Sequence, residues 1–195
     1  MFRVQILTAT LCASFIFASY ANADVTVGSA RYPASTSITI DGKPVSLTMT
    51  GAAMRQRFFV DVYAIASYMQ AGAPVHNAAE LASADVPKQL HLVMQRDVSG
   101  RDVAESFRAA IRQNHPEPAF RDEVNALVRM LREGSARRGE QILLTHIPGV
   151  GLQVSVSGKD PFTIRNANFS KAVWEIYLGY YNVGDAVKRA LVSGL

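Results

Sequence analysis

Cysteine is nearly absent from this sequence, which has a single one, Cys12, among 195 residues. Cys12 lies in an N-terminal segment that we expect to be removed, so the mature chain would contain no thiol. Disulfide bonds, zinc–thiolate sites and cysteine nucleophiles are then excluded from the mature protein. The folded domain has to be stabilised by its core alone, which fits an exported protein in an oxidising compartment.

Long apolar runs are also missing beyond the N-terminal segment MFRVQILTATLCASFIFASYANA, residues 1–23. This segment has a cationic start at Arg3, an apolar middle and the small residues of Ala21-Asn22-Ala23 at its end. That layout is typical of a secretory signal peptide cleaved after Ala23. A membrane anchor is the alternative, but polar residues interrupt the apolar run, which is shorter than the roughly 20 residues of a span. We therefore expect a periplasmic or secreted protein without a stable membrane span.

Charge of one sign is not in large excess, since the formal net charge is +4 at pH 7 and the loss of Arg3 lowers it by one, to +3. Spread over the domain, this mild balance gives no indication of nucleic-acid binding. The 195 residues less the 23 of the signal peptide leave 172, enough for one domain, 24–195, with a sizeable core. No internal repeat or low-complexity linker divides it.

Motifs for metals and cofactors are missing as well. None of the histidines stands four residues from another or beside a second plausible ligand, so a metal site has little support. The histidines are His76, His91, His115 and His146. The chain has no GxSxG, P-loop or GxGxxG motif in a strand–turn–helix setting. We expect neither a metal ion nor a cofactor.

Alternating apolar residues predict β-strands in the first half of the chain. Ile38 to Met49 alternate around Asp41-Gly42, which is typical of a hairpin because glycine accepts the positive φ of the turn. The stretch RQRFFVDVYAIASYMQ, residues 55–70, is rich in aromatic and β-branched residues and predicts one long strand. Residues 90–98 predict a further strand.

Helical periodicity begins after Val98. Ser99 to Asp102 have the spacing of a helix N-cap, and His115-Pro116 ends that helix because the residue before a proline avoids the helical region. Further helices are expected at 120–131, 168–179 and 184–195, with a strand–turn–strand unit at 140–156. Strands and helices in separate runs predict an α+β domain with helices packed on one face of a sheet.

Three segments carry a resemblance to a known family. The chain resembles the chalcone isomerase-like superfamily in RFFVDVYAIASYM, then in QRDVSG before a helix, and then in FSKAVWEIYLGYYNVGDAVKRAL. These segments occur in the family's order and at compatible spacing. The resemblance covers most of the chain from Leu47 onward, and the C-terminal segment is its most specific part. It implies an α+β open-faced β-sandwich, with a large antiparallel sheet, helices layered on one face and a ligand cleft between them.

The resemblance also implies the kind of site. Plant chalcone isomerases cyclise a chalcone with an arginine, two threonines, a tyrosine and an asparagine, whereas fatty-acid-binding members keep an arginine and place a tyrosine at the first threonine. Matched on VYAIASY, this chain has Tyr63 at that threonine. Phe120, Leu127 and Ile176 fall at the catalytic tyrosine, the asparagine and the second threonine, so apolar groups replace these donors. The resemblance implies the fatty-acid-binding branch, no catalytic residues and no appreciable chalcone cyclisation.

The implied carboxylate site joins Tyr63 to an arginine, with Arg55 ahead of Arg57. In one straight strand Arg55 and Tyr63 would lie roughly 26 Å apart, at about 3.3 Å per residue. The two can act together only if the chain bends near Gln56–Phe58. The alternative is that both arginines are solvated and that Tyr63 is a core tyrosine with a satisfied hydroxyl.

The expected function is non-catalytic periplasmic binding of a fatty acid or similar amphipathic carboxylate, whose tail would lie against the helices carrying Phe107, Phe120 and Ile176. Two alternatives stay open: an isomerase or lyase for a polyphenol-like substrate, and a structural or interaction protein with a filled cleft. An open apolar cleft with one cation favours the binder, several convergent hydroxyls favour the enzyme, and a filled cleft favours the structural protein. The sequence leaves the chain length of the ligand and the oligomeric state open.

Overall fold

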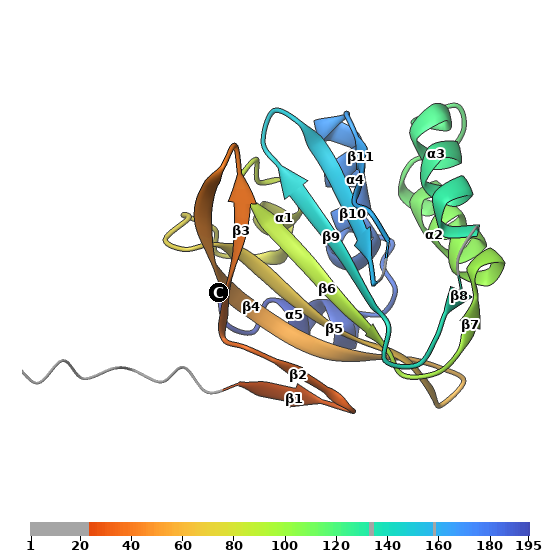
Figure 1. Cartoon of the computed structure of the whole chain (residues 1–195), viewed down its shortest axis with the longest axis horizontal. Helices are drawn as coiled ribbons and strands as arrows, with labels where there is room; N and C mark the ends of the chain where they lie inside the picture. Colours follow the sequence, from red (N-terminus) through yellow and green to blue (C-terminus); the bar gives the residue numbers. More distant parts are fainter. Residues whose placement is uncertain (1–23, 133–134, 158) are drawn as a thin grey trace, which may run out of the picture.

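An antiparallel sheet with helices on one side organises the chain (Figure 1). The computed structural model describes residues 24–132, 135–157 and 159–195, and the predicted signal peptide, residues 1–23, lies outside them. The strands are β1 (Val25–Val27), β2 (Ala30–Tyr32), β3 (Ser35–Ile40), β4 (Lys43–Arg57), β5 (Val60–Gln70), β6 (Lys88–Met94), β7 (Val98–Ser99), β8 (Ser135–Ala136), β9 (Gln141–Ile147), β10 (Gly151–Val156) and β11 (Phe162–Ile164). The helices are α1 (Ala78–Ser83), α2 (Gly100–Asn114), α3 (Arg121–Arg132), α4 (Ala167–Leu178) and α5 (Asp185–Leu191).

Seven strands form the main sheet, in the order β11-β10-β9-β6-β5-β4-β3, and every neighbouring pair is antiparallel. β1 with β2 and β7 with β8 form two-stranded ribbons. The segment that carries α2 and α3 is inserted between β6 and β9, which nevertheless pair with each other. The helical insertion therefore leaves the meander of the sheet intact.

Two tight turns set the register of the longest strands. β3 and β4 join at Asp41-Gly42, with φ of 50° and 74°, so the predicted hairpin is confirmed. β4 and β5 join at Phe58-Phe59, whose φ values of 50° and 63° suit a two-residue primed turn. The prediction of one strand over residues 55–70 is therefore wrong. Aromatic and β-branched residues on both sides of the turn, and in the turn itself, give a continuous strand signal although the chain reverses there.

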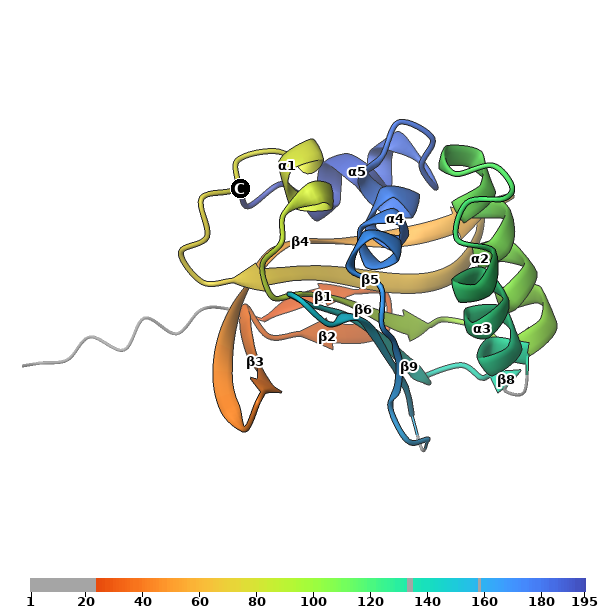
Figure 2. The same ribbon diagram turned by 90° about the horizontal axis from the view of Figure 1, so that it is seen from above.

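The helices of the described residues lie on one side of the main sheet, as predicted (Figure 2). Ser99 caps α2, because its Oγ accepts a hydrogen bond from the backbone N–H of Asp102 at 3.1 Å, and His115 is the C-cap. Both predicted ends of this helix are thus confirmed. α4 packs between α1 and α2. Within the described residues no helix combines the length and the apolar character needed to cross a bilayer.

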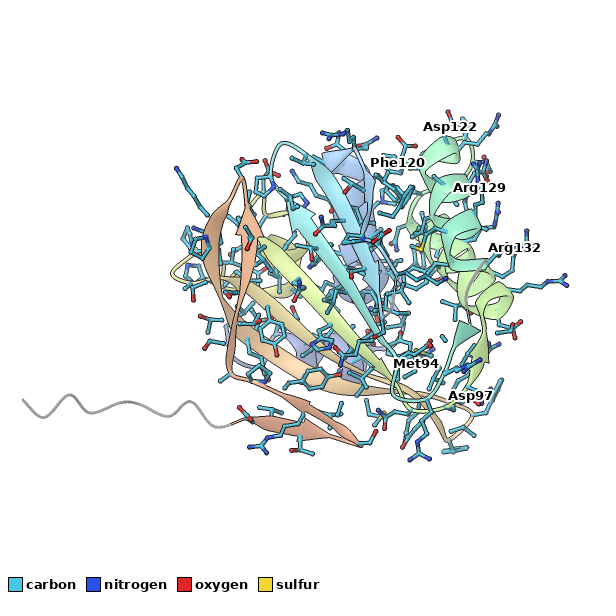
Figure 3. All side chains as sticks on the ribbon, viewed as in Figure 1. Met94, Asp97, Phe120, Asp122, Arg129 and Arg132 are labelled. Atoms are coloured by element: carbon cyan, nitrogen blue, oxygen red, sulfur yellow. The ribbon has the colours of Figure 1, made fainter. Side chains whose placement is uncertain are left out.

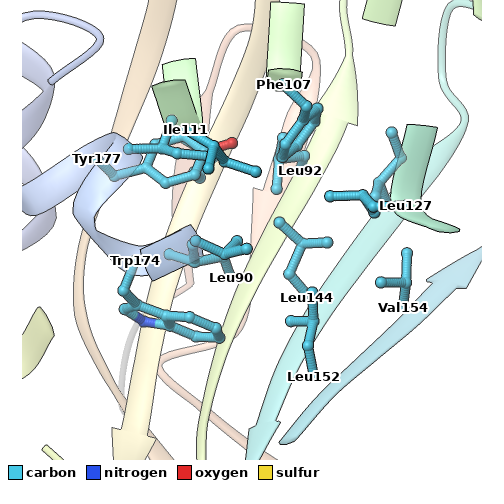
Figure 4. Packing of buried hydrophobic residues seen from close by; sticks show 14 of the residues in the cluster. Leu90, Leu92, Phe107, Ile111, Leu127, Leu144, Leu152, Val154, Trp174 and Tyr177 are labelled. Carbon is cyan, nitrogen blue, oxygen red and sulfur yellow. The ribbon is translucent and has the colours of Figure 1, made fainter. Parts of the chain in front are cut away.

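The main core fills the space between the helices and the sheet (Figure 4). Leu90 and Leu92 of β6 and Leu144 of β9 pack under Trp174 and Tyr177 of α4, and each of the five is at most 1% exposed. The opposite face of the sheet carries a smaller apolar cluster beneath β1 and β2. The larger of the two apolar clusters therefore lies on the helical face.

A β-bulge in β4 anchors α5. The register of β4 against β5 shifts just before Gly51, which leaves Thr50 without a strand partner. The Thr50 hydroxyl donates to the carbonyl oxygen of Leu191 at 2.8 Å, and the Gly194 N–H donates to the Thr50 carbonyl oxygen at 2.9 Å. A Cβ atom on Gly51, whose φ is +155°, would lie 2.0 Å from the carbonyl oxygen of Ala190. The close approach of α5 to the strand thus requires glycine at this position.

Candidate ligand-binding site

Arg55 and Tyr63 lie opposite each other across the β4–β5 hairpin. The Phe58-Phe59 turn makes them cross-strand partners, and directly opposite Cβ atoms lie about 4.5–5.5 Å apart. The bend that a joint site requires is therefore present, and the separation expected for a straight strand does not apply. Both side chains are half-buried.

Tyr177 of α4 brings a second hydroxyl to this pair. Burial is the main cause that raises the pKa of Tyr63, while the neighbouring Tyr177 hydroxyl and the charge of Arg55 lower it. The pKa of Tyr177 is raised well above its ordinary value, first by burial and then by Tyr63, while Arg55 acts in the opposite direction. Two neutral phenols and one guanidinium, which we call the Arg55 cluster, thus meet at the edge of the core. They offer hydrogen-bond donors to an oxyanion such as a carboxylate.

Arg57 lies outside the Arg55 cluster. It is exposed and pairs with Val60 beside the turn. Its guanidinium carbon lies 5.5 Å from the ring centroid of Phe58, within the range of a cation–π interaction. Of the two arginines named from the sequence, the structure places Arg55 beside Tyr63.

Tyr177 was not among the residues expected from the sequence, which pointed to its neighbour Ile176. Ile176 is 3% exposed and belongs to the main core. α4 is buried nearly all round, with eight of its twelve residues inside, so its apolar periodicity does not indicate which residue faces Tyr63. The available signal was the phenol in WEIYLG, one position after the family's second threonine.

The two phenylalanines expected to contact a ligand tail come from different elements. Phe107 of α2 is 8% exposed and lies on the helical side of the core near Tyr177 (Figure 4). Phe120 precedes α3 with a φ of 53°, and its ring packs edge-on against Phe169 with the centroids 5.7 Å apart. Phe107 thus belongs to the main core and Phe120 packs against it, and the contact of either residue with a ligand stays a prediction.

The distance between the two ends of this boundary suits an extended tail. Figure 3 shows Phe120 far from Met94, which is the cross-strand partner of Tyr63. Phe169, which contacts Phe120, and Tyr177 are eight residues apart on α4, or about 12 Å along the helix axis. A tail that starts at the Arg55 cluster and ends near Phe120 would follow α4.

The α4 side chains along this path are closely packed, since Trp174, Ile176 and Tyr177 are at most 3% exposed. An apolar cavity between α2, α3 and the sheet has a volume of about 20 Å³, room for one water molecule. Its lining includes Val103, Met130 and Ile142, with Lys159 at one side. A larger, shallow hollow of about 610 Å³ is lined by Tyr180, Tyr181 and polar neighbours and does not include the Arg55 cluster. A fatty-acid tail would have to displace α2 and α3 from the sheet.

A second buried polar group, which the sequence did not indicate, joins α1 and α4 to the sheet. The His146 ring, fully buried, pairs through Nδ1 with Ser170 Oγ and through Nε2 with Asp85 Oδ1, both at 2.9 Å. Lys88 Nζ donates at 2.7 and 2.9 Å to two carbonyl oxygens at the C-terminal end of α1. The order serine–histidine–aspartate is that of a hydrolase triad, but Ser170 is 0% exposed, so no substrate reaches its hydroxyl. The group is a structural tie between distant segments.

Acidification is expected to destabilise the fold through His146. Burial is the main cause that lowers its pKa, followed by the charge of Lys88, while Asp85 acts in the opposite direction. The folded protein therefore keeps the imidazole neutral, whereas the unfolded chain takes up a proton near pH 6.5, the ordinary pKa being about 6.5. The unfolded state then binds more protons, so the free energy of unfolding falls as the pH drops below about 6.5. Urea denaturation over a pH series measures this.

Burial also lowers the pKa of Lys88 to about 7. Like His146, Lys88 therefore makes the free energy of unfolding rise with pH. The unfolded chain holds this proton up to about pH 10.5, so stability rises further from about pH 7 toward that value. His146→Gln should reduce the dependence below about pH 6.5, to which His91, whose pKa burial also lowers, contributes with the same sign. The matched control His76→Gln, at an exposed histidine, should leave it unchanged. A His146→Gln variant with the full wild-type dependence would show that other groups cause it.

These features define a class of protein: an open-faced α+β sandwich in which one cation and two phenols border an apolar core. The chain belongs to the chalcone isomerase-like family, whose model matches residues 25–193. The resemblance of the three segments and the fold that it implied are thus confirmed. Among the described residues there is no group of three or more histidine, cysteine, aspartate or glutamate side chains arranged to hold a metal ion.

The comparison with solved structures adds a relative of the same fold. The crystal structure of the fatty-acid binding protein AtFAP1 from Arabidopsis thaliana matches with a TM-score of 0.65 and 16% sequence identity, over 87% of this chain and 96% of that one. At this identity the similarity establishes the fold. A comparison with curated proteins finds no match.

Proposed function

We propose that the protein binds a fatty acid or similar amphipathic carboxylate in the periplasm without chemical turnover. The observation that carries this proposal is the Arg55 cluster, a guanidinium beside the hydroxyls of Tyr63 and Tyr177 at the edge of an apolar core. A carboxylate there would accept charge-assisted hydrogen bonds. The shared fold with a plant protein whose name describes fatty-acid binding supports the same class of ligand.

Binding would be coupled to an opening of the helical layer. α2 and α3 bury one apolar stripe each and carry charged residues elsewhere. Displacing this pair exposes apolar surface that the tail of the ligand covers again. The ligand stabilises the open state because it binds that state more tightly than the closed one. The carboxylate would stay at the Arg55 cluster, and the tail would reach toward Phe120.

A titration of the delipidated mature protein tests this function. We expect dodecanoate and hexadecanoate to bind, and hexadecanol, which has the same tail as hexadecanoate without the charge, to bind at least about tenfold more weakly. Equal affinity for the alcohol would show that no carboxylate site contributes. Failure of all three ligands to bind would favour the structural protein with a filled cleft.

Native mass spectrometry of protein purified from its own periplasm tests the ligand and the export together. The expected mass is that of a chain beginning at Asp24, with a lipid carboxylate released on denaturation. Recovery of the full-length chain only from membranes would contradict the predicted cleavage after Ala23.

A second candidate function, an isomerase for a polyphenol-like substrate, gains from the two convergent hydroxyls. Tyr63, Tyr177 and Arg55 could stabilise an enolate oxygen. Because Phe120 and Ile176 still replace two hydroxyl donors of the family's catalytic set, we expect no appreciable flavanone formation from a chalcone. An acceleration above about 10⁴-fold in a purified sample would make this the better assignment.

A further inference from the structure

The turn between β4 and β5 exposes two adjacent aromatic rings. Phe58 is 84% exposed, Phe59 is 99% exposed and the following Val60 is 46% exposed. Both phenylalanines have a positive φ, which bulky residues rarely adopt, and Asn-Gly would form the same turn without that strain. An exposed and strained aromatic pair at a position where the fold needs neither indicates a contact outside the chain.

The shape and size of this turn favour a lipid bilayer over a protein partner. The turn lies at the lower right edge of the molecule in Figure 1, at the end of the two longest strands. Two phenyl rings offer roughly 300–500 Å², about half of the roughly 800 Å² that each partner contributes to a stable protein interface. A small projecting apolar group suits the interfacial region of a bilayer, which buries such groups about 5–10 Å deep.

Exposed arginines lie close to the two rings. Arg57 precedes them, and its guanidinium lies over the Phe58 ring. Arg96 follows β6, and the end of β6 runs beside the start of β5, since the Gln95 N–H donates to the Val62 carbonyl oxygen at 2.9 Å. These positions place two cations beside the apolar tip.

Two further arginines reach the same end of the molecule from β8. The backbone N–H of Arg138 donates to Asp97 Oδ1 at 2.8 Å, and Asp97 lies beside Met94 in Figure 3. Arg137 precedes it in the same turn, and both side chains are exposed. Within the part of the chain that the structure describes, no ion pair involves the four arginines of this end, which are Arg57, Arg96, Arg137 and Arg138.

The carboxylates of these turns are engaged by uncharged donors. Asp61 accepts a hydrogen bond from Gln56 Nε2 at 2.7 Å, Asp97 from the backbone of Arg138, and Glu140 from the backbone of Arg137 at 2.9 Å. Four arginines against these three carboxylates leave this end net positive, in a chain whose formal net charge of +4 becomes +3 when Arg3 is lost with the predicted signal peptide. The charge therefore complements anionic headgroups.

We propose that this membrane tip, residues 57–60 with Arg96, Arg137 and Arg138, docks the protein on an anionic lipid bilayer. The two phenyl rings insert among the acyl chains, and the guanidinium groups lie at the phosphates. Arg55 is two residues from the tip, so docking brings the proposed carboxylate site to a surface in which amphipathic carboxylates partition. This last step rests on the proposed function, whereas docking itself does not.

The test uses ligand-free mature protein and sedimentation with two kinds of vesicle, phosphatidylcholine alone and phosphatidylcholine mixed with phosphatidylglycerol in equal parts. Wild-type protein should bind the anionic vesicles, and binding should weaken with salt. Phe58→Asn combined with Phe59→Gly keeps the turn and removes both rings, so we expect at least about tenfold weaker binding with an unchanged or higher melting temperature. Arg138→Gln should weaken binding about fivefold.

A matched control removes aromatic residues elsewhere. Tyr180 is 86% exposed and Tyr181 is 55% exposed, and Tyr180→Ser combined with Tyr181→Ser should leave vesicle binding unchanged. A tryptophan in place of Phe59 should shift its emission to the blue on anionic vesicles and be quenched by brominated lipid, because the native Trp174 is fully buried.

Three outcomes would overturn the proposal. The first two are no binding of the wild-type protein to anionic vesicles, and equal binding by the Phe58→Asn, Phe59→Gly variant. The third is a wild-type dimer that this variant dissociates, because the tip would then bind a second copy of the chain. The docking result is separate from the proposed function, because the variant keeps Arg55, Tyr63 and Tyr177. It should bind dodecanoate in solution within about twofold of wild type. Vesicle binding without any fatty-acid affinity would support docking and contradict the proposed ligand.

Discussion

Replacing Arg55 with glutamine is expected to weaken fatty-acid binding roughly 10- to 150-fold, because a charge-assisted hydrogen bond is worth about 1.5–3 kcal/mol. Arg55 is the cation that lies across the hairpin from Tyr63, with a half-buried side chain. Tyr63→Phe removes one neutral hydroxyl and keeps the ring, so a smaller loss, about 2- to 12-fold, is expected. Calorimetric titration with hexadecanoate measures each change.

Arg57→Gln is the matched control for this prediction. Arg57 has the same charge and lies in the same strand, but it is exposed beside the turn. We expect its affinity for hexadecanoate in solution to stay within about twofold of wild type, since exposed charges in water contribute little. Tight binding that neither substitution weakens would mean that the tail alone drives affinity. A greater loss from Arg57→Gln than from Arg55→Gln would move the carboxylate to the turn.

Replacing Gly51 with alanine is expected to lower the free energy of unfolding by about 2–6 kcal/mol. Backbone strain contributes about 1–3 kcal/mol and overpacking a further 1–3 kcal/mol, about as much again. The φ of Gly51 is +155°, and the new Cβ atom would lie 2.0 Å from the Ala190 carbonyl oxygen and 2.8 Å from the Leu191 carbonyl carbon. Both neighbours are backbone atoms and cannot rotate away, so α5 has to move off the strand. Urea denaturation of the two proteins measures the difference.

Gly72→Ala separates the two contributions. Gly72 has a φ of +75°, but nothing lies within 4 Å of a Cβ atom built on it. It should therefore show only the cost of a left-handed alanine, about 1–2 kcal/mol. Equal losses at the two positions would mean that the contact with α5 does not matter for stability.

The Arg55 cluster shows how far the sequence leads toward the site. Tyr63 was found because VYAIASY matches the family's strand, and Arg55 because an arginine precedes it. Their adjacency could not be derived, since a two-residue turn is normally signalled by glycine or asparagine. At Phe58 and Phe59 the pairing of two long strands imposes a positive φ that the local residues disfavour. Tyr177 was missed for a different reason. α4 is buried on almost every side, so its apolar periodicity does not show which side of the helix faces Tyr63.

By itself the sequence determined the features that depend on local chemistry. The hairpin at Asp41-Gly42 and the capped start of α2 at Ser99 follow from single residues and their immediate neighbours. The α+β class follows from the change in apolar period along the chain, and the family follows from three segments that resemble it and occur in its order.

Only the tertiary structure decided which distant residues meet. It reversed the chain at Phe58-Phe59, turned Tyr177 toward Tyr63, and joined His146 to Ser170 and Asp85. It also left an apolar cavity of about 20 Å³ between α2, α3 and the sheet. These outcomes depend on strand register and on the packing of α2, α3 and α4 against the sheet, which involve residues tens of positions apart and leave no local signal in the chain.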